Sequence, residues 1–323
     1  MPRCLLAFLL LFPASTTLAD TVFVVSFTTG ELVRYDSSDP AGTRTVLSGS
    51  GSLVKPAAIT VGPDGDLYIG EDGDGATFAP RITKFEPATL TLSTVVAFGG
   101  FEVFPASLAF QGDDLLVGRN PFFGNTGPIV RVANATGGVV SVSDYTSGGG
   151  LASSPGLARA VDGQLYVADQ TYDFPSGVAS GPVSRFDAAG AYVGHLIASG
   201  SSGLAGPTGL VLSGSVLYTA SIMNGAILRT DLTTGVTTTF AALGNPFEIG
   251  ALAPLADGGL LAGSPSGSGN IYRFSADGTL LTTYPTGLGQ IGGIATVPEP
   301  GTGVVLTVAA AAGLFMQGRR RRA

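Results

Sequence analysis

The stretch PGLARAVDGQLYVAD, residues 155–169, is one copy of a pattern that recurs along most of this chain. Each copy has a short strand, a tight turn, a strand rich in Leu, Tyr and Val, a loop, and a third strand of the form apolar-x-basic-aromatic-acidic. Other first hairpins read PAAITVGPDGDLYIG (56–70), PASLAFQGDDLLVG (105–118), PTGLVLSGSVLYTA (207–220) and IGALAPLADGGLLAG (249–263). The basic residues of the third strands are Arg34, Lys84, Arg131, Arg185, Arg229 and Arg273. They stand 50, 47, 54, 44 and 44 positions apart, a spacing typical of propeller repeats, which run to about 40–50 residues.

The residue types within these repeats favour β-structure. Asp64-Gly65, Asp162-Gly163 and Asp257-Gly258 are predicted hairpin turns, because Asp and Gly tolerate the positive φ that tight turns require. The strands alternate apolar with small or polar residues, as expected for sheets packed between neighbouring sheets. No amphipathic helix of helical length is apparent between residues 21 and 297.

The two ends of the repeat region complement each other. Val22–Phe27, Glu31–Asp36 and Thr43–Leu47 match the second, third and fourth strands of a repeat, and Gly292–Val297 supplies the missing first strand. We therefore predict an all-β protein, a six-bladed β-propeller over residues 20–297 whose last blade joins both ends of the chain. Such closure pairs sheet edges that would otherwise aggregate. A sandwich of unrelated hairpins is the alternative, but it does not explain the split blade.

Three short motifs carry a resemblance to known propellers. Leu165-Tyr-Val-Ala-Asp169, Arg185-Phe-Asp187 and Pro207-Thr-Gly-Leu210 resemble NHL-type six-bladed propellers and, more distantly, the gluconolactonase and streptogramin-lyase propellers. The resemblance implies the fold. It does not imply an activity, because one fold serves many functions.

The first nineteen residues have the layout of a secretory signal peptide. Arg3 precedes the apolar run Leu5–Phe12, and Thr17-Leu18-Ala19 follows as a small-residue cleavage pattern. Cleavage is predicted between Ala19 and Asp20. An N-terminal membrane anchor is disfavoured because the apolar run is far shorter than the ~20 residues of a span. The single cysteine, Cys4, is lost with this peptide, so the exported body must be stable without disulfides.

The C-terminal end resembles a sorting signal. Pro298-Glu299-Pro300 is followed by the apolar run Val304–Met316 and by Arg319–Arg322, which together resemble the PEP-CTERM sorting signal of Gram-negative bacteria. The resemblance implies that residues 298–323 form a sorting signal with a transmembrane helix and an arginine cluster. It further implies that an exosortase-type protease recognises Pro298, Glu299 and Pro300. The protein would then be held transiently in the inner membrane and released to the cell surface or the extracellular space.

Composition excludes several classes of function. The chain has 16 Lys and Arg against 23 Asp and Glu, a net charge of −7, one His and one Cys. We therefore expect no nucleic-acid partner, since phosphate binding needs clustered basic residues. A zinc site built from Cys and His lacks ligands. A Ser/His/Asp triad is not expected either, because the lone His195 lies in a predicted outer strand and no Gly-x-Ser-x-Gly motif occurs.

The loops after the second strands indicate where a ligand would dock. They are long in three consecutive repeats, at 71–80, 119–128 and 170–182. We predict that they form a lopsided rim on one mouth of the tunnel, because mobile loops on a rigid scaffold commonly carry binding sites. The candidate ligand-rim residues are Phe78, Phe122, Phe123, Tyr172 and Phe174. The alternative is that these loops merely cap the tunnel.

A divalent cation is the one cofactor considered. The lactonase resemblance implies a metal held by carboxylates in the tunnel, and Glu71 and Asp169 are the weak candidates because they follow second strands and could point inwards. The matching positions elsewhere are Arg119, Ser221 and Ser264, which are poor ligands for a hard cation. The stretch Asp72-Gly-Asp74 lacks the remainder of a calcium loop and is interpreted as a turn.

These observations favour a non-catalytic, exported and surface-sorted propeller. We expect it to act as a binding or extracellular-matrix and biofilm-associated module, with exopolysaccharide or a surface protein as its partner. The alternative is a metal-dependent hydrolase of the lactonase type, motivated by the fold and by Glu71 and Asp169.

Overall fold

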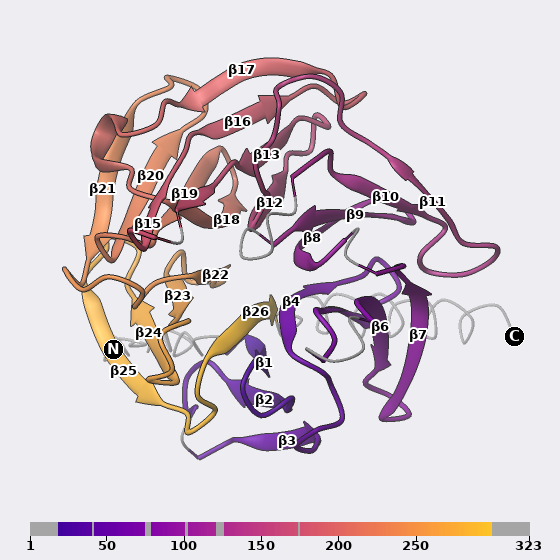
Figure 1. Cartoon of the computed structure of the whole chain (residues 1–323). Helices are drawn as coiled ribbons and strands as arrows, with labels where there is room; N and C mark the ends of the chain where they lie inside the picture. The colour runs from indigo at the N-terminus through magenta and orange to yellow at the C-terminus, as the bar shows by residue number, and fades with distance from the viewer. Residues whose placement is uncertain are drawn as a thin grey trace, which may run out of the picture.

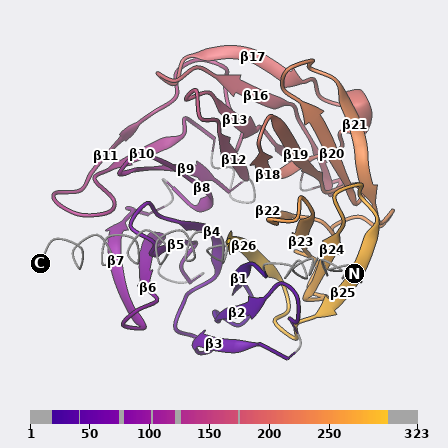
Figure 2. The same cartoon turned by 180° about the vertical axis from the view of Figure 1, so that it is seen from behind.

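Six four-stranded antiparallel sheets surround a central axis as the blades of a propeller (Figure 1). The structure is a computed structural model that describes residues 19–40, 42–74, 79–100, 103–120, 126–173 and 175–298. The predicted six-bladed all-β fold is confirmed. Figure 2 shows the same ring from behind, with the innermost strands of all blades facing the axis.

The strands follow the chain from the axis outwards in five of the blades. Blade 2 contains β4 (Pro56–Val61), β5 (Leu67–Glu71), β6 (Arg81–Glu86) and β7 (Thr91–Ala97), and blade 3 contains β8 (Pro105–Gln111), β9 (Asp114–Arg119), β10 (Val130–Ala133) and β11 (Ser141–Asp144). Blade 4 contains β12 (Gly156–Arg159), β13 (Leu165–Ala168), β16 (Val183–Phe186) and β17 (Tyr192–Ile197). Blade 5 contains β18 (Pro207–Ser213), β19 (Val216–Ser221), β20 (Ala226–Asp231) and β21 (Thr237–Ala242), and blade 6 contains β22 (Ala251–Pro254), β23 (Leu260–Gly263), β24 (Asn270–Phe274) and β25 (Leu280–Pro285).

Blade 1 joins the two ends of the described chain. Its order is β26 (Ile291–Val297), β1 (Thr21–Ser26), β2 (Leu32–Asp36) and β3 (Thr45–Ser48). β26 pairs with β1 in antiparallel register, with Thr21 opposite Val297 and Val24 opposite Ile294. The predicted closure is therefore confirmed, and no inner strand of a blade is left without its partner among these elements.

Apolar side chains fill the spaces between neighbouring blades. The buried residues form six clusters, and each cluster joins two adjacent blades. The second strands are buried along most of their length, and LYIGE of β5 and LLAG of β23 are buried throughout, because a sheet covers each of their faces. The outermost strands β7 and β11 are mostly exposed. The core is therefore a ring around the axis.

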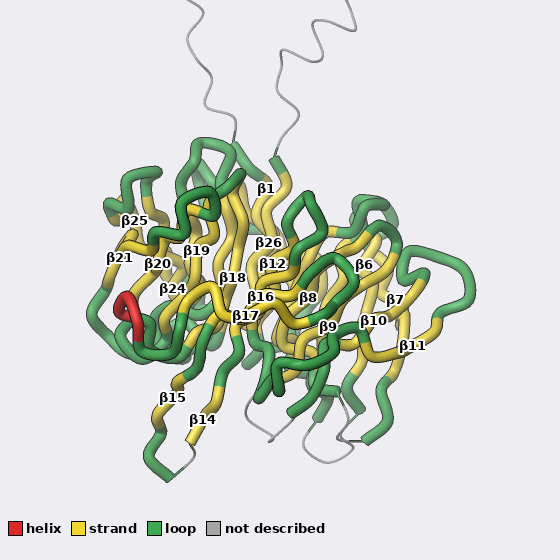
Figure 3. Tube along the Cα trace, turned by 90° about the horizontal axis from the view of Figure 1, so that it is seen from above, coloured by secondary structure: helices red, strands yellow, loops and turns green. Residues whose placement is uncertain are grey.

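Both ends of the described chain lie on one face, and a hairpin extends from the other (Figure 3). β14 (Thr171–Asp173) and β15 (Val178–Ser180) form a separate two-stranded sheet between β13 and β16. The predicted loop 170–182 is thus largely a hairpin. Because second strands end where this hairpin begins, the hairpin marks the mouth toward which the loops after all second strands open.

The predicted signal peptide and sorting signal lie largely outside the described residues. This holds for residues 1–18 of the signal peptide and for residues 299–323 of the sorting signal, including Glu299, Pro300 and the expected transmembrane helix. Within the ranges that are described, no helix is long and apolar enough to cross a membrane. Asp20 is 3% exposed: its N–H donates to Ser37 Oγ at 2.8 Å, and its carboxylate accepts from the Ala256 N–H at 2.9 Å. Pro298 directly follows β26.

Candidate functional site

A cavity of about 530 Å³ lies on the propeller axis. Its wall contains one aliphatic side chain from the inner strand of each blade, namely Ile59, Leu108, Leu157, Leu210, Leu252 and Ile294. Small-molecule sites in proteins have volumes of about 300–1,000 Å³ and mostly apolar walls. The cavity therefore has the size and the surface of a ligand site.

Glycines allow the inner strands to approach each other around the axis. A Cβ on Gly209 would lie well inside contact distance of the Gly250 carbonyl oxygen, which accepts a 2.9 Å hydrogen bond from the Gly209 N–H. The Gly of the Pro207-Thr-Gly-Leu210 motif is therefore required by close packing of blades 5 and 6. This motif has a structural explanation that needs no ligand.

The residues proposed as metal ligands belong to a repeated structural position, which we call the latch position. It is occupied by Ser26, Glu71, Arg119, Asp169, Ser221 and Ser264. In five blades the latch side chain bonds to the backbone of the segment that leads into its own blade. The partners are Leu288 O for Ser26, Val54 N for Glu71, Ala152 N for Asp169, Ala205 N for Ser221 and Phe247 O for Ser264. Blade 3 differs, since Arg119 Nε donates to Pro128 O at 2.9 Å.

Glu71 also binds two side chains inside the protein. Its side chain is fully buried, and Arg81 donates to it from Nε at 2.8 Å and from Nη2 at 2.9 Å. Thr83 Oγ1 donates to the same carboxylate. The bond to Glu71 raises the pKa of Arg81, which keeps the guanidinium charged. This carboxylate therefore acts as a buried counter-ion and does not line the cavity.

Asp169 is likewise turned away from the cavity wall. Its Oδ1 accepts from the Ala152 N–H at 2.9 Å, and its Oδ2 lies 3.4 Å from Ser184 Oγ. Burial raises its pKa, an effect that the Ala152 bond opposes. The expectation that Glu71 and Asp169 could point into the tunnel is not met. Within the described ranges, no group of three or more His, Cys, Asp or Glu is placed to hold a metal ion.

The residue that follows each latch lies at the mouth of the cavity, and we call this the mouth position. It is occupied by Phe27, Asp72, Asn120, Gln170, Ile222 and Pro265, and all but Asp72 line the cavity. Because successive side chains of extended backbone point to opposite sides, a shift of one residue exchanges the inward and outward sets. Glu71 and Asp169 therefore each lie one residue before a mouth position.

The six mouth positions divide the mouth into two halves. The three polar residues belong to consecutive blades 2, 3 and 4, and the three apolar residues belong to blades 5, 6 and 1. The polar half coincides with the blades that have long loops after their second strands. The mouth is therefore lopsided, although its polarity arises from side chains at the ends of the strands.

Asp72 and Asn120 form the centre of the polar half. Asn120 Nδ2 donates to Asp72 Oδ2 at 3.0 Å, which ties blade 2 to blade 3. Asp72 is 2% exposed, and its Oδ1 has no hydrogen-bond partner within the part of the chain that the structure describes. Burial raises the pKa of Asp72 to about 7, against the opposing effects of Asn120 and Lys55. The sequence gives little signal for this residue, because the second strand that precedes it is buried along its whole length.

Of the predicted rim residues, the structure describes Tyr172. It is half-buried in β14, opposite Ala179 of β15, in the hairpin that extends beyond the mouth. The four phenylalanines predicted for the rim, namely Phe78, Phe122, Phe123 and Phe174, lie outside the described residues.

The single histidine is far from the axis. His195 is exposed in the outermost strand β17, and its Nδ1 lies 3.3 Å from Ser184 Oγ and 3.2 Å from the Tyr192 hydroxyl. Ser184 also lies between His195 and Asp169. In a catalytic triad the carboxylate orients the histidine directly, whereas here the serine is in the middle. The prediction that His195 lies in an outer strand is confirmed.

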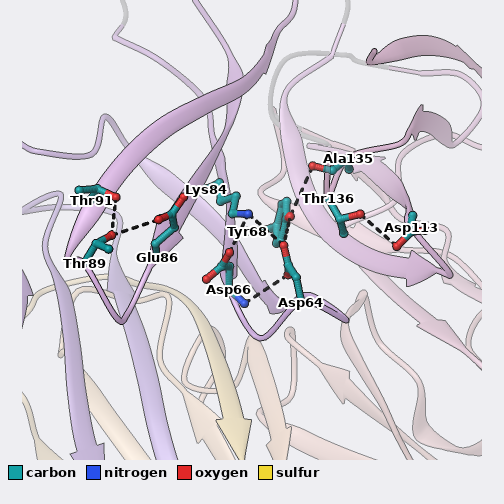
Figure 4. Close-up of polar contacts among 10 residues, drawn as sticks. All are labelled: Asp64, Asp66, Tyr68, Lys84, Glu86, Thr89, Thr91, Asp113, Ala135 and Thr136. Carbon is teal, nitrogen blue, oxygen red and sulfur yellow. Dashed lines mark hydrogen bonds and ion pairs between the residues drawn. The ribbon is translucent and has the colours of Figure 1, made fainter. Parts of the chain in front are cut away.

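A polar cluster on the opposite face shows the role of the third-strand base in blade 2 (Figure 4). Lys84 of β6 lies 3.0 Å from Asp64 Oδ2 and 2.6 Å from Asp66 Oδ2, both in the β4–β5 turn. The Tyr68 hydroxyl donates to Asp64 Oδ2 at 2.8 Å. Arg131 with Asp114 and Arg273 with Asp257 form equivalent pairs in blades 3 and 6. These bases therefore hold the first turn of a blade to its third strand.

Together these features define the class of the protein: a six-bladed β-propeller with a cavity on its axis. No protein-family model matches the chain, and no curated protein matches it. Solved propellers do. A chain from the crystal structure of a nidogen/laminin complex superimposes with a TM-score of 0.68 at 13% identity, covering 86% of this chain and 98% of that one. TolB from Acinetobacter baumannii gives a TM-score of 0.57 at 14% identity, covering 89% of this chain and 68% of that one. At these identities the similarity is one of fold.

Proposed function

We propose that this protein is an exported binding module that takes up a ligand in its axial cavity at the cell surface. The observation that carries the proposal is the cavity, with one aliphatic residue from every blade in its wall and a half-polar mouth. The acidic and hydroxyl side chains just behind the wall bind backbone atoms at the latch positions, so they serve structure. The cavity wall is thus mainly apolar, and the acidic and hydroxyl groups near it bind the backbone. This arrangement supports binding over catalysis.

The geometry does not favour the lactonase alternative. That interpretation depends on Glu71 and Asp169 as metal ligands, and both carboxylates are directed into the interior of the blades. One solved neighbour comes from a nidogen/laminin complex, in which a propeller of this kind is part of an assembly between two proteins. For this chain we propose exopolysaccharide or a surface protein as the partner.

The proposed route to the surface combines the signal peptide, the membrane tail and cleavage at Pro298-Glu299-Pro300 by an exosortase-type protease. The position of the described ends supports it. The start of β1 and the end of β26 lie side by side on the face opposite the mouth (Figure 3). A tail held in the inner membrane would therefore leave the mouth directed away from the bilayer.

Sorting is tested with the full-length chain in a Gram-negative host that has an exosortase. We expect Pro298→Ala combined with Glu299→Ala to keep the protein in the inner-membrane fraction, whereas Glu86→Ala in the body leaves release unchanged. Equal release of all forms would contradict the proposed processing site.

Ligand binding is tested by narrowing the cavity. Ala106 lines the cavity and is half-buried, so Ala106→Phe places a ring in the ligand space. We expect that isolated cells carrying exopolysaccharide on their surface no longer retain this variant. The control is Ala189→Phe, in an exposed turn on the far face. Equal retention of both variants would contradict a role for the cavity.

A further inference from the structure

The uncharged wall of the axial cavity indicates which ligands it accepts. We infer that the cavity selects uncharged, amphipathic ligands and rejects ions. The inference rests on the proposed function, namely binding in the axial cavity, and it specifies the chemical class of the ligand.

The first argument concerns charge. Among the described residues that line the cavity there is no Asp, Glu, Lys, Arg or His. The nearby acidic latch residue Glu71 is already neutralised by Arg81 at 2.8 Å. A charged group that entered the cavity would lose its water and would find no counter-ion among the described residues of the wall, which is costly in an apolar site. An uncharged ligand avoids this cost.

The second argument concerns polar groups. Three amide side chains line the cavity at its mouth, those of Asn120, Gln170 and Gln290. Gln170 Nε2 donates to Pro207 O at 2.9 Å and Asn120 Nδ2 donates to Asp72, so two of the amides are held in fixed orientations. Amides offer both donors and acceptors. They are suited to hydroxyl, carbonyl or amide groups at one end of a ligand.

The third argument concerns the remaining surface. Leu157, Leu210 and Leu252 represent the ring of aliphatic side chains around the axis, and Phe27 and Ile222 extend it to the apolar half of the mouth. Burial of an apolar ligand surface contributes about 25 cal/mol per Å². The complementary ligand therefore has an apolar body and an uncharged polar end.

The test compares two dyes that differ by a single charged group. N-phenylnaphthylamine is neutral, and anilinonaphthalene sulfonate is the same ring system with a sulfonate. Both become fluorescent in apolar sites, so each can be titrated against the exported protein. The measurements are made in about 0.5 M salt, where the Debye length is only ~4 Å. Repulsion by the acidic surface then cannot account for a difference between the dyes.

We expect the neutral dye to bind at least about tenfold more tightly than the sulfonate. Binding of the neutral dye should weaken about tenfold in Ala106→Phe and in Ala57→Phe, which narrow the cavity from two different blades. Ala189→Phe on the far face should bind like the wild type. Unfolding midpoints of all variants show whether each remains folded.

Two other results are informative and can be told apart. If both dyes bind with similar affinity and both are lost in the narrowed variants, the cavity binds ligands but does not select by charge, which overturns this inference alone. If the neutral dye fails to bind, or binds equally to wild type and narrowed variants, the cavity is not the binding site. That result overturns the proposed function as well.

Discussion

The side-chain amide of Asn120 holds a carboxylate oxygen of Asp72 at 3.0 Å, and this bond joins blades 2 and 3 at the mouth of the cavity. The amide side chain lines the cavity, whereas the carboxylate lies behind it and is almost completely buried. Asp72 therefore holds Asn120, which faces the ligand space. This arrangement keeps a carboxyl group buried, which is unfavourable for its charged form.

The buried carboxyl should make stability depend on pH. The pKa of Asp72 is raised to about 7 by burial, whereas an unfolded Asp has a pKa of about 3.9. Between these two values the unfolded chain has lost this proton and the folded chain retains it, so stability falls as pH rises from about 4 to 7. We expect Asp72→Asn to remove this decrease, a gain on the order of 3 kcal/mol at pH 8 relative to pH 4.

Urea unfolding of wild type and Asp72→Asn at the two pH values measures this difference. Asp113→Asn is the control, since Asp113 is exposed. The assignment would be wrong if Asp72→Asn and Asp113→Asn changed the pH profile to the same extent.

The latch role of Glu71 predicts a large structural cost when it is removed. Glu71→Ala leaves Arg81 without its buried partner and the Val54 N–H without its acceptor. Breaking a buried ion pair by removing one partner typically costs about 3–5 kcal/mol, and we expect about 3 kcal/mol because Arg81 is partly exposed. Chemical denaturation checks the value, with Glu86→Ala in the same blade as control. A loss below about 0.5 kcal/mol would argue against the latch.

Gly209 should be intolerant of any side chain. Gly209→Ala forces the inner strands of blades 5 and 6 apart, because the new Cβ would collide with the Gly250 carbonyl oxygen. We expect a loss of about 2 kcal/mol. Gly137→Ala is the matched control, since a Cβ there meets no atom within 4 Å. The close approach of the blades would be disproved by equal thermal stability of the two variants.

Lys84 should stabilise the far face in a pH-dependent way. Despite partial burial, hydrogen bonds from Lys84 and Tyr68 lower the pKa of Asp64. A lowered carboxyl pKa contributes stability above the unfolded pKa of about 4, and this stability is lost as pH falls through the folded value. Lys84→Met should therefore cost about 1–2 kcal/mol at pH 7 and much less at pH 3.

The control for this pair is Arg34→Met, at the equivalent position of blade 1. Arg34 is exposed, so its removal should cost less than about 0.5 kcal/mol. Denaturation at both pH values distinguishes the variants, and a cost for Lys84→Met that is the same at pH 3 and pH 7 would count against the charge interaction.

Much of the fold could be predicted from local features. The Asp-Gly turns, the second strands and the third-strand bases recur at a regular spacing, and the remainder at the two ends predicted β26 beside β1. The β14–β15 hairpin was missed because TYD and VAS are short segments that flank an ordinary loop composition.

The site was predicted less well, for a physical reason. The sequence suggests Glu71 and Asp169 as inward-facing residues, whereas Asn120 and Gln170 of the mouth positions line the cavity. β5 is buried on both faces, so its residues carry no alternation of polarity from which an inward face could be deduced. The inner strands also have β-bulges near the mouth, as at Pro56 to Ala58 and Pro105 to Ser107, which redirect side chains.

By itself, the order of the residues determined how many sheets form and which strands close the ring, because turns, strand lengths and repeat spacing depend on neighbours along the chain. The tertiary structure decided that Asn120 and Gln170 line the cavity while Glu71 and Asp169 bind backbone. That choice depends on which side of a strand meets the axis, and it is set only when six sheets pack against one another.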